Sequence, residues 1–126
     1  MKLVSNIAGI VLGFLFNLVA LNYFFHFFDM PGPPAGSPPA MFIGAMITTG
    51  YFAMVKVLEI VGGLLVAIPK TQPLGLLILG PIVWNILSFH IFMAGGAGLF
   101  PLPFLVAALS LVVLWSNRAS FSRLLP

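Results

Sequence analysis

The chain has 126 residues, of which 61% are hydrophobic and only 6% are charged, and its formal net charge is +3. Soluble domains carry about 25% charged residues, so this composition, with a mean hydropathy of +1.19, predicts an integral membrane protein. The positive charge is too small and too dispersed to predict a nucleic-acid partner, and the lack of cysteine excludes disulfides and thiolate-held clusters.

Four apolar runs follow one another within a single domain over residues 1–126, and we expect each to cross the lipid bilayer. The first extends from Leu3 to Phe28 and ends in aromatic residues, which are typical of a membrane interface. A proline-rich loop separates it from the second, Ala40 to Ile68. The third extends from Leu74 to Met93 and the fourth from Leu99 to Trp115. The predicted fold is therefore all-α, an integral membrane four-helix bundle.

The basic residues outside these runs predict how the bundle is oriented. With four crossings, Lys2, Lys70, Arg118 and Arg123 all fall on one side, and the two loops on the other side contain no Lys or Arg. Basic residues gather on the cytoplasmic side of membrane proteins. We therefore expect both the N- and C-termini in the cytoplasm.

The second run contains the only charged residues expected inside the bilayer, Lys56 and Glu59. Three positions apart on a helix, they share one face. A charge at the centre of a bilayer costs between ~2.5 and ~17 kcal/mol, so such residues face the bundle interior and pair with one another. This predicts an intramembrane site, in which Glu59 is a candidate proton relay.

Further polar residues are placed to join this site. Thr49 lies on the same seam as Lys56 and Glu59, while Asn17 and Asn85 lie near the midpoints of the first and third runs. We expect the five side chains to converge in a polar, ligand-binding pocket. The alternative is that the amides only bond helices together, at ~0.6 to ~2 kcal/mol each, and that the ion pair sets helix orientation.

Glycines and histidines complete the candidates. Gly9 and Gly13, four apart in the first run, form a small-xxx-small pattern that lets two helix backbones approach closely.

His26 and His90 lie at similar predicted depth on different helices, and two such imidazoles can ligate haem iron axially. The alternative is two interfacial or hydrogen-bonded imidazoles. The sequence contains no cluster of ligands for a catalytic zinc ion.

One combination of motifs resembles the DoxX and DoxX-like family of small bacterial four-span membrane proteins. The resemblance covers nearly the whole chain, and its most telling residues are Lys56, Glu59, Gly62, Gly63, Pro81, Asn85 and His90. It implies a four-helix bundle in the bacterial cytoplasmic (inner) membrane, with the family motif falling on Lys56, Glu59, Asn85 and His90. One branch of the family resembles a quinone-reducing membrane subunit, others are associated with oxidative-stress complexes, and animal relatives assist receptor assembly.

Two classes of function stay open at this point, and so does the question whether the chain is an enzyme. In the first, a quinone or other lipophilic ligand contacts Lys56 and Asn85, Glu59 relays a proton, and membrane or peripheral redox subunits supply electrons. In the second, the chain is a non-catalytic accessory subunit or assembly factor of a larger membrane complex. A small transporter is a weaker third alternative, because no inverted repeat is visible. Assembly into a homo-oligomer is open in each.

Overall fold

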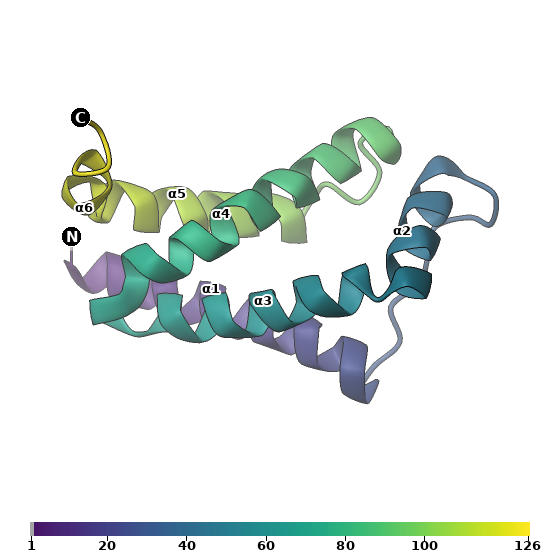
Figure 1. Ribbon diagram of the computed structural model, residues 1–126, viewed down its shortest axis with the longest axis horizontal. Coiled ribbons are helices and arrows are strands. Elements are labelled where there is room, and N and C mark those ends of the chain that lie inside the picture. The colour runs from purple at the N-terminus through teal and green to yellow at the C-terminus, as the bar shows by residue number, and fades with distance from the viewer. Residues whose placement is uncertain (1) are drawn as a thin grey trace.

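The computed structural model describes residues 2–126, and every regular element in that range is helical. The elements are α1 (Lys2–Phe25), α2 (Pro38–Thr49), α3 (Tyr51–Ala67), η1 (Pro69–Thr71), α4 (Gln72–Ser88), η2 (Phe89–Met93), α5 (Leu102–Ser116) and α6 (Arg118–Ser122). Of these, η1 is a 3₁₀ turn and η2 a π-helical turn that continues α4. Figure 1 shows α1, α3, α4 and α5 running back and forth along the long axis, with both termini at the same end of the molecule.

The lengths of the helices indicate a membrane protein. The segments Lys2–Phe25 and Pro69–Met93 are each long and apolar enough to cross a membrane, and α2 with α3 adds a third if the two count as one span. The apolar helix α5 has 15 residues and falls short of that length. The predicted all-helical class is confirmed, whereas four crossings and the cytoplasmic placement of the termini stay predictions.

The structure departs from the predicted single helix over Ala40 to Ile68. Two helices, α2 and α3, occupy this run, and they are bent by 85° relative to each other. The break lies at Gly50, whose φ of 80° is left-handed and ends α2 with a hydrogen bond from its N–H to Ile47 O. Only glycine adopts this conformation without steric cost. Gly50 lies inside an otherwise unbroken apolar run, which is why hydropathy alone missed the bend.

A junction of five glycines brings α1, α3 and α4 into close contact, and its members are Gly9, Gly13, Gly62, Gly63 and Gly75. A Cβ added at Gly9 would lie 2.5 Å from Val66 O, and one at Gly13 would collide with the carbonyl oxygen of Gly63. Both neighbours are backbone atoms, which cannot rotate away. The predicted close approach at Gly9 and Gly13 is therefore confirmed, with α3 as the partner.

The apolar core lies along the axis between the four long helices. Its largest fully buried side chains are Leu12, Val66, Leu79 and Val113, one each from α1, α3, α4 and α5. Many large apolar side chains point outward instead, and Trp84 of α4, for example, is 72% exposed. An outer surface of this kind suits lipid rather than water.

Candidate functional site

Lys56 and Glu59 face the interior of the bundle. Their side chains are only 10% and 4% exposed, and Lys56 Nζ lies 3.4 Å from Glu59 Oε1. The buried face of α3 holds these two residues together with Gly62, Gly63 and Val66. The predicted ion pair is therefore present and buried, about halfway along a helix that packs against α1 and α4.

The immediate surroundings of the pair are aromatic. Lys56 Nζ lies 4.8 Å from the centroid of the Phe52 ring, one turn earlier on α3. The Phe52 ring in turn meets Tyr23 of α1 edge to face, with 5.1 Å between the centroids. A cation over an aromatic face is stabilised by the ring quadrupole. Through Phe52 and Tyr23, the ammonium group of Lys56 is therefore in a chain of contacts that joins α3 to α1.

The pair has hydrogen-bonding capacity that residues 2–126 do not fill. A lysine ammonium has three donors and an ionised glutamate accepts through both oxygens. The only hydrogen bond between them joins Nζ to Oε1, at a long 3.4 Å, and Oε2 accepts none from the described residues. Buried ion pairs offset the cost of desolvation only when the remaining donors and acceptors are also bonded. Two ammonium donors and one carboxylate oxygen therefore make no hydrogen bond within residues 2–126.

The structure places the other predicted pocket residues at different distances from the pair. Asn17 is half-buried and its Nδ2 donates to Gly13 O at 2.9 Å. The same Nδ2 would lie 2.5 Å from a Cβ at Gly63, one turn along α3 from Glu59. Asn17 is thus at the same α1–α3 interface as the ion pair.

Thr49 and Asn85 lie elsewhere. Thr49 is exposed in the last turn of α2, before the bend, and its hydroxyl donates to Ala45 O at 2.7 Å. Asn85 is exposed and donates to Pro81 O at 3.0 Å. It lines a pocket of about 180 Å³ among α2, α4 and η2, to which neither Lys56 nor Glu59 contributes. The five predicted side chains therefore do not form one pocket in this conformation.

The two histidines lie on segments that separate. His26 follows α1, is exposed, and has a left-handed φ of 55°. His90 is half-buried in η2, with Nδ1 2.7 Å from Ile86 O. In Figure 1 the C-terminal end of α1 and the C-terminal end of α4 lie on opposite sides of α3. Within residues 2–126 no three His, Asp or Glu side chains gather as metal ligands.

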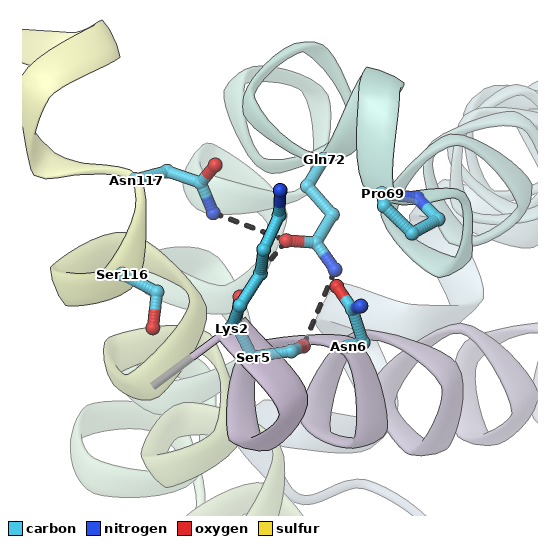
Figure 2. A pocket seen from close by; sticks show the side chains of 7 residues that line it. All are labelled: Lys2, Ser5, Asn6, Pro69, Gln72, Ser116 and Asn117. Carbon is cyan, nitrogen blue, oxygen red and sulfur yellow. Dashed lines mark hydrogen bonds between the residues drawn. The ribbon is translucent and has the colours of Figure 1, made fainter.

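A second polar cluster, which the sequence pattern does not predict, joins α1, α4 and α5. Gln72 is 2% exposed. Its Oε1 accepts from Ser5 Oγ at 2.9 Å and from Asn117 Nδ2 at 3.1 Å, while its Nε2 donates to Ser5 O at 3.2 Å. Figure 2 shows these side chains converging from three helices. In the sequence Gln72 belongs to a short polar turn between Pro69 and Pro73. Its position at the start of a helix is the only sequence feature that is consistent with its burial.

Comparison of the chain with models of protein families, with curated proteins and with solved structures finds no match.

Proposed function

We propose that the chain is an integral membrane protein that binds a lipophilic carbonyl compound of the quinone class beside Lys56 and Glu59, as the membrane component of an oxidoreductase system. The observation that carries this proposal is a buried ion pair whose hydrogen-bonding capacity is incompletely used. We also propose that the chain is related to DoxX-like proteins and lies in the bacterial inner membrane. The motif around Lys56 and Glu59 supports this part of the proposal.

The chemistry of the pair fits such a ligand. A quinone presents two carbonyl oxygens, which accept hydrogen bonds, on a flat ring that packs well against aromatic side chains. The Lys56 ammonium can donate to one carbonyl while the rings of Phe52 and Tyr23 contact the ligand. Reduction of a quinone to a quinol takes up two electrons and two protons. Glu59, hydrogen-bonded to Lys56, would take up a proton from water and pass it to a carbonyl oxygen, twice in succession, and a partner redox subunit would supply the two electrons.

The test is a calorimetric titration of a short-chain quinone into the protein in lipid nanodiscs. The K56M/E59L variant replaces both charges by apolar side chains of similar length, so no unpaired charge is left buried. We expect it to bind the quinone at least tenfold more weakly than the wild type. The matched control is R123Q, which removes an exposed charge in the C-terminal segment and should leave binding unchanged. Equal affinities of wild type and K56M/E59L would refute the proposal.

A second function, an accessory subunit or assembly factor, is favoured by α2. This helix bends away from the bundle, and Pro39 is its only buried residue. Met41, Phe42 and Ile47 are large apolar side chains exposed on it. Purification in mild detergent distinguishes this function: a stoichiometric partner that F42K releases would support it, whereas a partner-free protein that binds quinone would support the first.

A further inference from the structure

The pocket at the end of the bundle that carries both termini is a second candidate binding site. Its volume is about 250 Å³, and its lining includes Lys2, Ser5, Asn6, Gln72, Ser116 and Asn117. That is well above the ~10–15 Å³ that a cavity needs in order to hold one water molecule. It is smaller than the ~300–1,000 Å³ of pockets for drug-sized ligands. The pocket therefore suits a small polar group rather than a whole cofactor.

The pocket is built on a rigid floor. Ser5 and Gln72 are 4% and 2% exposed, and their two mutual hydrogen bonds hold α1 against the start of α4. Asn117 adds α5 through its bond to Gln72 and a second bond to Val113 O at 2.8 Å. In Figure 2 the side chains of Lys2 and Asn6 rise from α1 beside this network. Helices from three parts of the chain thus fix the shape of the pocket.

One buried lining group lacks a hydrogen-bond partner within residues 2–126. The hydroxyl oxygen of Ser116 is buried and makes no hydrogen bond. The side-chain amide of Asn6, which is half-buried, lines the same pocket. A buried polar group without a partner destabilises the fold, because it has lost its hydrogen bonds to water and gained none in return. A ligand with several acceptor oxygens could accept hydrogen bonds from Ser116 and Asn6, because hydroxyl and amide groups can donate.

The charge of this end indicates an anion. Four basic residues belong to the elements that meet at this end, which are α1, η1, α6 and the residues after α6. They are Lys2, Lys70, Arg118 and Arg123. Asp29 follows α1 at its other end, and Glu59 lies in the middle of α3, so no acidic side chain shares this end. Arg118 also lies 4.4 Å over the ring of Trp115, and tryptophan is enriched at the interface between membrane and water. Cationic and hydroxyl donors around a small polar pocket match the oxygens of a phosphate group.

We propose that this pocket binds a phosphate group with net negative charge, carried by an anionic phospholipid or free in solution, with Lys2 as its cation and Ser116 and Asn6 as its neutral donors. The pocket does not include Lys56 or Glu59. An experiment that refutes quinone binding would therefore leave this proposal unaffected. Its position at an end of the bundle places it where phospholipid headgroups lie if the helices cross a membrane.

The test is native mass spectrometry of the detergent-solubilised protein titrated with phosphatidylglycerol, and with dioleoylglycerol as the lipid lacking a phosphate. The variants are K2Q, S116A and the matched control R123Q, which removes one charge outside the pocket. S116A removes a hydroxyl that has no protein partner, so its thermal stability without added lipid should match that of the wild type. We expect K2Q and S116A to bind phosphatidylglycerol at least fivefold more weakly, R123Q to change less than twofold, and dioleoylglycerol not to saturate.

A third arm separates the two sources of phosphate. If millimolar inorganic phosphate displaces phosphatidylglycerol and raises the melting temperature above that in chloride of equal ionic strength, the pocket takes free phosphate. If it does neither while the lipid preference holds, the ligand is a headgroup. Equal losses in K2Q and R123Q, or equal binding of the two lipids by the wild type, would overturn the proposal, because either shows only diffuse surface charge.

Discussion

Replacing the buried ion pair one partner at a time should destabilise the fold more than replacing both. The K56M variant leaves a carboxylate unpaired, and E59L leaves an ammonium unpaired, at positions where the side chains are 10% and 4% exposed. Removing one partner of a buried pair costs about 3–5 kcal/mol. Exchanging both for apolar groups of similar volume is often neutral or stabilising by about 1–4 kcal/mol. K56M/E59L should therefore be at least as stable as either single variant.

The measurement is reversible unfolding in mixed micelles with increasing dodecyl sulfate, followed by the helical circular dichroism signal. V57L is the matched control, because Val57 lies on the same helix and is 49% exposed. It should change the free energy of unfolding by less than about 0.5 kcal/mol. If the losses in K56M and E59L simply added in the double variant, the two charges would not be coupled and the structural account of the pair would be wrong.

Three further predictions concern packing, the polar network and topology. G13A should lose about 1–3 kcal/mol of stability in the same unfolding assay, because its Cβ meets the backbone of α3; G44A, where nothing lies within 4 Å, should lose none. Q72L should cost about 1–3 kcal/mol, since Ser5 and Asn117 lose their acceptor, and a stable Q72L would show that the network is not structural. Reporter tags on the two termini should both read cytoplasmic, and opposite sides would exclude four crossings.

Much of the fold was predictable because apolar runs and small-residue spacing act locally. Hydropathy placed helices in all four runs, and the Gly9 and Gly13 spacing predicted a close helix contact that the structure places against Gly63. The bend at Gly50 was not predictable in this way. A glycine in an apolar run is compatible with both a straight helix and a left-handed break, and tertiary packing decides between them.

The part of the candidate site that could be predicted is the part fixed by the free-energy cost of exposing a charge to lipid, because that cost decides which way a charged side chain faces. A charged pair in an apolar run must face inward, and Lys56 and Glu59 do. The convergence of Thr49 and Asn85 with them depended on straight helices with aligned midpoints. The bend moves Thr49 onto a separate helix, and the outward face of α4 carries Asn85. The burial of Gln72 could not be predicted, because it depends on which helices meet at the start of α4.

The most direct test of the central claim is a solid-state NMR distance between the ligand and Lys56. The protein would carry ¹⁵N in its lysine side chains and be reconstituted in liposomes with a quinone labelled with ¹³C at its carbonyls. The account predicts a dipolar coupling that corresponds to a hydrogen bond, with about 3 Å between Nζ and the carbonyl oxygen, and its loss in K56M/E59L. A bound quinone without coupling to any lysine, or with a coupling that survives in K56M/E59L, would contradict it.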